Sequence, residues 1–157
     1  MIAAVYDCMI YVQAALSSQG ASFACLNLAE DHHVTLYLCP VILDEIKSTL
    51  ERPGFRRKYS KLTDQRVANF LSRITSVGKL LPDPGQTFTL ARDPKDEPYL
   101  NLAIAAPASY LVSRDKDLLS LKDDAKFGVT CPHLTILEPA AFLAHARAQI
   151  AAEQNKE

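Results

Sequence analysis

The sequence has no tryptophan, only 5 glycines among its 157 residues, and no excess of charge of either sign. Its formal net charge of -1 and pI near 6.4 provide no global attraction for polyanions, so any contact with nucleic acid must come from a local basic patch. No run approaches the roughly 18 apolar residues that a membrane span requires. No secretory leader opens the chain, so we expect a soluble, cytoplasmic protein without membrane contact.

The cysteines and histidines do not form a metal-binding or disulfide pattern. The sequence contains no Cys-x-x-Cys pair and no histidines at zinc-site spacing, which argues against a zinc ribbon. The four cysteines are widely spaced and are expected to be reduced thiols in or near the core: Cys8, Cys25, Cys39 and Cys131. The hydrophobic content of 48% over 157 residues is enough for the core of one domain.

Short apolar runs alternate with amphipathic segments along the chain. We expect strands at residues 2–6, 34–38, 79–81, 110–113 and 134–137, and helices at 8–16, 21–30, 41–50, 63–77, from 98 onward and at 139–150. Residues 52–61 are expected to be a connector. This alternation predicts a three-layer α/β/α domain over residues 1–146, with a mainly parallel central sheet of four or five strands. Residues 147–157 are expected to form a polar, frayed tail.

Acidic residues follow two of the predicted strands or begin helices near the same edge of the sheet. Asp7 ends the first strand, Asp115 follows the fourth, and Glu45 and Asp96 lie early in helices. Each has a local explanation, because Asp7 and Asp96 occupy helix N-cap positions and a helical Glu usually faces solvent. For Asp7 taken alone, capping is the favoured explanation. Gathered at one edge, however, these carboxylates would repel one another unless a cation such as Mg²⁺ or Mn²⁺ compensated them.

A carboxylate-bound divalent metal suits phosphodiester hydrolysis, because it lowers the pKa of a bound water and stabilises the leaving oxygen. Such a site needs no Ser, Cys or His nucleophile, and we assign the four histidines no catalytic role. A solvated loop is the favoured explanation of the one dense basic cluster, but if a phosphate backbone is bound anywhere, this cluster is the first choice for the contact. It contains Arg52, Arg56, Arg57, Lys58 and Lys61.

Four segments together resemble the PIN-domain ribonucleases, and most closely the VapC-like toxin components of bacterial toxin-antitoxin pairs. They are VYDCMI, LDEI, DPKDEPYLNLAIAAPASYLVSRDKDLL and LTILEPAAFL. The resemblance implies a Mg²⁺- or Mn²⁺-dependent endoribonuclease that is often a homodimer and often inhibited by an antitoxin protein. By position, it assigns catalysis and metal binding to Asp7, Glu45, Asp96 and Asp115. It makes Asp117 an accessory acid and gives Ser113 the place of a small hydroxyl residue. Asp93, which precedes the same helix as Asp96, is a further accessory acid, and Arg114 is a further RNA-contact candidate.

Two departures from the family pattern keep a second hypothesis open. Met9 stands where these proteins usually carry Asn, and Arg114 stands where Gly is frequent. A thioether cannot replace an amide that orients a carboxylate or a water. The alternative is therefore a non-catalytic PIN-like module that binds a partner protein or RNA. A phosphatase with an aspartyl nucleophile ranks lower, because such enzymes place a second Asp where this chain has Met9.

Overall fold

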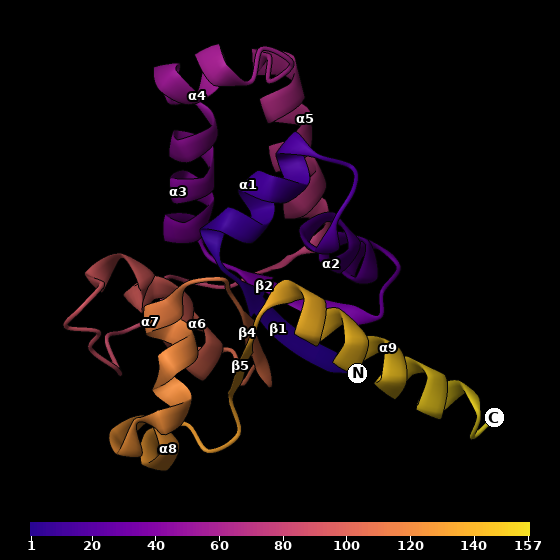
Figure 1. Cartoon of the computed structure of the whole chain (residues 1–157), viewed down its shortest axis with the longest axis vertical. Coiled ribbons are helices and arrows are strands. Elements are labelled where there is room, and N and C mark those ends of the chain that lie inside the picture. Colours follow the sequence, from indigo (N-terminus) through magenta and orange to yellow (C-terminus); the bar gives the residue numbers. More distant parts are fainter.

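A computed structural model describes all 157 residues (Figure 1). The strands are β1 (Ile2–Tyr6), β2 (Val34–Leu38), β3 (Lys79–Leu80), β4 (Tyr110–Val112) and β5 (Thr135–Leu137). The α-helices are α1 (Cys8–Leu16), α2 (Ala21–Glu30), α3 (Pro40–Leu50), α4 (Pro53–Lys58), α5 (Asp64–Val77), α6 (Glu97–Ala105), α7 (Lys116–Leu119), α8 (Ala125–Thr130) and α9 (Pro139–Gln154). Two 3₁₀ turns, η1 (Pro94–Asp96) and η2 (Ser120–Asp123), precede α6 and follow α7.

The five strands form one sheet in the order β3-β2-β1-β4-β5, and every neighbouring pair is parallel. Helix α6 contacts β1, β2 and β4 on one face. Helices α2 and α9 cover the other face, where the Tyr6 hydroxyl donates to the Cys25 carbonyl at 2.8 Å and the Phe142 ring packs edge-on against Tyr6 and Tyr110. The predicted three-layer α/β/α architecture with a parallel sheet is confirmed.

The core is a single cluster of 42 buried hydrophobic residues whose members run from Ile2 to Ala146. The central strands β1 and β4 are apolar without alternation, as expected for parallel strands covered on both faces. All four cysteines are buried and unpaired. No helix has both the length and the apolar composition needed to cross a membrane.

The strand order places a topological switch point between β1 and β4. From β1 the chain first moves to β2 on one side, and later returns to add β4 on the other side. Open parallel sheets bind ligands at such a point, in the crevice beyond the carboxyl ends of the strands. Backbone pairing continues past both strands, because the Asp7 amide donates to the Val112 carbonyl at 2.9 Å and the Ser113 amide to the Leu137 carbonyl at 3.0 Å. The residues that follow β1 and β4 are therefore held firmly at this edge.

Three regions differ from the sequence-based expectation, and one of them is helix α8 at Ala125–Thr130, which was not predicted. The connector predicted at residues 52–61 contains helix α4. The helix begins at Pro53, a residue that favours the first helical turn. The Phe55 ring packs against the Tyr59 ring at the end of the helix, with the ring centres 5.2 Å apart. Helix α9 continues to Gln154, past the end expected at Ile150, so most of the expected tail is helical although residues 151–157 are exposed. Alanine and glutamate favour the helix there without any need for packing.

Candidate metal centre

Asp7 lies at the end of β1 and is almost fully buried, with 6% of its surface exposed. It occupies the N-cap position of α1, yet its side chain makes no capping hydrogen bond. Instead, its Oδ2 accepts a hydrogen bond of 2.6 Å from the Ser113 hydroxyl, and the Ser113 Oγ accepts one of 3.0 Å from the Asp115 amide. The capping explanation for the Asp7 side chain is wrong, and Ser113 links the residues that follow β1 and β4.

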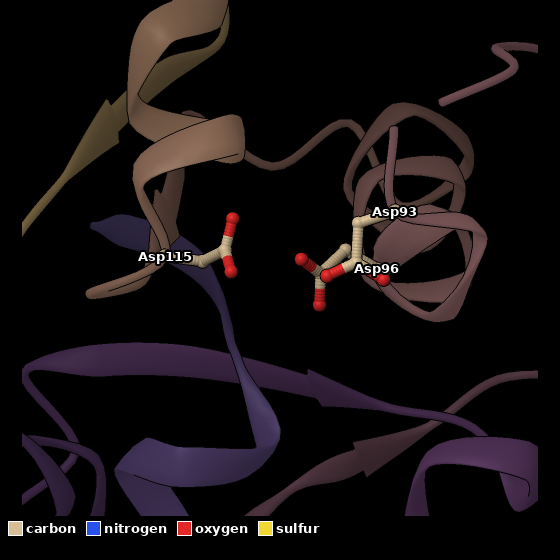
Figure 2. Close-up of side chains that lie close together, drawn as sticks. All are labelled: Asp93, Asp96 and Asp115. Atoms are coloured by element: carbon tan, nitrogen blue, oxygen red, sulfur yellow. The ribbon is translucent and has the colours of Figure 1, made fainter. Parts of the chain in front are cut away.

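Three carboxylates meet beyond the ends of these strands. Asp93, Asp96 and Asp115 each offer a ligand oxygen, and the three oxygens lie within 4.8 Å of one another. Figure 2 shows the Asp115 carboxylate facing the other two, which come from the segment around η1. We call these three residues the acidic triad. Oxygens bound to one Mg²⁺ at about 2.1 Å lie at most about 4.2 Å apart, so only a small inward movement of the acidic triad would let its oxygens share an ion.

Asp115 combines a local role with an available ligand atom. Its Oδ1 caps α7 by accepting hydrogen bonds from the amides of Asp117 (2.8 Å) and Leu118 (3.1 Å). Asp115 therefore stabilises the start of α7, as expected for an acidic residue at a helix N-terminus. Its second oxygen has no hydrogen-bond partner within the chain, so Asp115 is able to cap the helix and bind a cation at once.

Asp96 carries the strongest sign that a cation belongs here. The residue is 9% exposed, its Oδ2 is buried without a hydrogen-bond partner, and it makes no capping hydrogen bond to α6. Burial first, and then the charges of Asp7, Asp115 and Asp93, raise the pKa of Asp96 to about 8. A carboxylate in this position must either keep a proton or be compensated by a positive charge. The residues present thus fit a divalent cation.

Glu45 lies in the second turn of α3, outside the acidic triad. Its Oε2 accepts a hydrogen bond of 2.8 Å from the hydroxyl of Tyr99, a fully buried residue of α6. Burial raises the pKa of Asp7, the Ser113 hydrogen bond partly offsets this, and the charges of Glu45 and Asp115 raise it further. Glu45 and Asp7 therefore share one electrostatic environment next to the triad.

The structure arranges the predicted site residues differently from the expected quartet. Asp93, expected to be an accessory acid, belongs to the acidic triad, whereas Asp7 and Glu45 lie beside it. Asp117 is partly exposed, and its Oδ1 is 4.0 Å from the guanidinium of Arg92. Sequence reasoning did not identify Tyr99. The available signal was a tyrosine in the first turn of an Ala- and Leu-rich helix, where a buried hydroxyl needs a partner.

The basic cluster lies away from the acids. It surrounds α4, at the opposite end of α3 from β2 and the site (Figure 1). Within it, Arg56 is held by Asp64 at 2.9 Å and by the Leu50 carbonyl. Arg114 is close to the acids in sequence, but its Nε donates to Gln13 at 3.0 Å. Contact between the cluster and RNA stays a prediction, and any such contact would lie away from the acids. The residues are Arg52, Arg56, Arg57, Lys58 and Lys61.

Replacing Ser113 with alanine tests how the site is held together. We expect the variant to lose about 1.5–3 kcal/mol of unfolding free energy, because a buried carboxylate loses a charge-assisted hydrogen bond. The pKa of Asp7 should rise, since this hydrogen bond lowers it. Urea denaturation measures the stability, and the exposed Ser72 offers a control whose alanine variant should stay within about 0.5 kcal/mol of wild type. Equal stability of the two variants would contradict the proposed role of Ser113.

Comparison with known proteins identifies related sequences. The family model described as "PIN domain" matches residues 3–117. Over 143 residues the chain is 27% identical to the uncharacterized protein MJ1680 of Methanocaldococcus jannaschii, with 90% of each chain covered. No solved structure matches significantly. The family match includes β1, α3, the acidic triad and Ser113, so every residue of the site lies within it.

Proposed function

Because the chain belongs to the PIN-domain family, whose members are generally nucleases, we propose that it is a metal-dependent endoribonuclease. The observation that carries this proposal is the acidic triad at the switch point of the sheet, with a buried Asp96 oxygen that has no partner within the chain. Carboxylate oxygens are ligands that suit hard divalent cations, and Mg²⁺ or Mn²⁺ is the proposed cofactor. The proposed substrate is RNA.

The residues have distinct roles in this proposal. Asp93, Asp96 and Asp115 would hold the cation, with Asp7 and Glu45 beside them as further ligands or as acceptors for metal-bound waters. The bound metal would activate a water for attack on phosphorus and stabilise the leaving oxygen. Ser113 orients Asp7 through its hydrogen bond, and Tyr99 orients Glu45. The buried setting of Asp7 and Asp96 strengthens their attraction to a cation, because water screens it less there.

Metal removal tests the enzymatic proposal directly. The purified protein should cleave a labelled single-stranded RNA when Mn²⁺ or Mg²⁺ is added, and EDTA should abolish the cleavage. Asp7→Asn should lower the rate at least about tenfold, as expected for a residue that touches or orients the metal shell, while the exposed Asp31→Asn should have no effect. Cleavage that persists in EDTA would exclude a metal mechanism.

Calorimetry separates the enzyme from the non-catalytic module that Met9 and Arg114 suggest. Met9 lies in the first turn of α1 and is 43% exposed, and its thioether cannot supply the side-chain amide that the family pattern has at this position. A folded protein that binds no Mn²⁺ at millimolar concentration and cleaves no RNA would favour the module.

We propose further that this nuclease is the toxin of a toxin-antitoxin pair, acting as a cytoplasmic homodimer that an antitoxin protein inhibits. The support is the resemblance of the segments around Asp7, Glu45 and Asp96 to VapC-like toxins. Expression of the chain alone should arrest bacterial growth, and co-expression of a small neighbouring reading frame should relieve the arrest. If the arrest persists when Asp96 is replaced with asparagine, growth inhibition does not arise from RNA cleavage.

A further inference from the structure

A hollow lies at the opposite end of α1 from Asp7, between the C-terminal end of α1 and the segment that joins α4 to α5. It has a volume of about 240 Å³. Its apolar surface comes from Ala15, Leu16 and Leu62. Its remaining lining includes Lys58, Tyr59, Lys61 and Arg66, and we call this hollow the basic pocket.

The cations of the basic pocket are not neutralised by the chain itself. The side chains of Lys58, Lys61 and Arg66 are exposed, and none of them forms an ion pair with a carboxylate. Arg56 and Arg73 differ in this respect, because Arg56 forms an ion pair with Asp64 and Arg73 forms one with Glu30. Three unpaired cations around one hollow produce a local positive potential although the whole chain has a net charge of -1.

The lining combines charge with an aromatic ring and an apolar surface. Tyr59 is partly exposed, its ring packs against Phe55, and the Lys58 ammonium lies 5.4 Å from its centre. An inorganic anion would bind to the positive charges alone. A nucleotide would also place its flat base against apolar and aromatic side chains. The volume is below the roughly 300–1,000 Å³ of pockets for drug-sized ligands. It therefore suits one base, with the phosphates at the rim.

We propose that the basic pocket binds one nucleotide of the RNA strand outside the cleavage site, with its base against Tyr59 and Leu62 and its phosphates at Lys58, Lys61 and Arg66. This inference rests on the proposed nuclease function. Helix α1 connects the acidic site to the basic pocket, because it begins directly after Asp7 and ends at the pocket residue Leu16. Its nine residues span about 13 Å. One single strand is able to cross this distance, so the pocket selects extended RNA over short fragments.

Binding in EDTA separates this inference from catalysis. Fluorescence anisotropy should follow a fluorescein-labelled 12-nucleotide single-stranded RNA at several salt concentrations. The triple variant Lys58→Gln, Lys61→Gln and Arg66→Gln should weaken binding at least about tenfold and reduce the salt slope by about 2, since each phosphate contact contributes about 0.7. A matched triple variant removes three exposed cations elsewhere and should retain most of the affinity. It changes Lys79, Arg147 and Lys156.

A change at Tyr59 tests the base contact separately from the phosphate contacts. Tyr59→Leu should weaken RNA binding about fivefold or more with an unchanged salt slope, because loss of a stacking surface involves no counterion. Thermal unfolding checks that the variant is folded. An oligoglutamate peptide of equal charge should displace the RNA poorly. Equal displacement would assign the pocket to acidic polypeptides and overturn the proposal.

The two proposals fail in different ways. Pocket variants that bind RNA as tightly as the matched control overturn the basic pocket, whatever the cleavage assay shows. If the wild type cleaves neither RNA nor bis(4-nitrophenyl) phosphate with Mn²⁺, the nuclease proposal falls while the binding result stands by itself. The small diester cannot reach from the acids to the pocket, so pocket variants should hydrolyse it at the wild-type rate.

Discussion

Replacing Asp96 with asparagine is expected to lower metal-dependent RNA cleavage at least about 100-fold, which exceeds the usual effect of losing a residue that only supports a metal ligand. Asparagine has nearly the same shape but carries no charge, so it binds a divalent cation much more weakly. In this structure the change also neutralises one of the three carboxylates whose oxygens lie within 4.8 Å of one another. Single-turnover cleavage of a labelled RNA at saturating Mn²⁺ measures the loss.

The same variant should be more stable than wild type when metal is absent. Burial and the charges of Asp7, Asp115 and Asp93 oppose ionisation of Asp96, so at neutral pH the metal-free fold must keep this group protonated although it is ionised in the unfolded chain. The neutral amide of asparagine removes this cost. Asp44→Asn is the matched control, because Asp44 is exposed and lies next to Glu45 on α3. The control should change neither cleavage nor stability. An Asp96→Asn protein that is destabilised in EDTA, or that cleaves RNA normally, would contradict a metal-binding role.

The second large effect is a pH dependence of the unfolding free energy of the metal-free protein, which added Mn²⁺ should counteract. The pKa of Asp96 is raised from 3.8 to about 8, so the folded metal-free protein holds a proton that the unfolded chain releases. The unfolding free energy should therefore be largest below about pH 4 as far as this group is concerned, and should fall as pH rises to about 8. The slope should be at most about 1.4 kcal/mol per pH unit, because one pKa unit corresponds to that free energy.

Addition of Mn²⁺ should raise the melting temperature in EDTA-free buffer, and by more at pH 8.5 than at pH 6. At the lower pH the cation must displace the proton on Asp96, whereas at the higher pH it binds a carboxylate that is already charged. For a chain of this length, each kcal/mol corresponds to about 2–4 °C. Differential scanning fluorimetry measures the shift, with Ca²⁺ and Na⁺ as comparison ions. A metal effect of equal size at both pH values would show that Asp96 does not titrate as proposed.

The local sequence was sufficient for most of the secondary structure. Residues 2–6 are an apolar run without polar alternation, as expected of a parallel strand covered on both faces, whereas residues 34–38 alternate between apolar and more polar side chains and are buried in the same alternation. Thr63 is the N-cap residue of α5, as its position before the helix predicts, and its hydroxyl accepts a hydrogen bond of 3.2 Å from the Arg66 amide. The helix α4 was missed because six residues are too few for a clear period, and its stability depends on the contact between Phe55 and Tyr59.

The grouping of the acids was only partly predictable. A parallel sheet places the ends of β1 and β4 at the same edge, so proximity of Asp7 and Asp115 follows from chain order and sheet class. Which carboxylates share one ligand position does not follow. Asp93 caps a 3₁₀ turn that ends at Asp96, and the orientation of this turn depends on how α6 packs on the sheet, which places Asp93 in the triad.

The sequence by itself determined the α/β class, the parallel sheet and the set of acids at its edge, because these depend on apolar patterning and on where each strand ends. Tertiary structure alone decided that Asp7 bonds to Ser113 rather than capping α1, that Tyr99 holds Glu45, and that Asp96 keeps a buried oxygen without a partner. The physical reason is that side-chain partners and burial depend on distances between segments far apart in the chain, which local pattern does not encode.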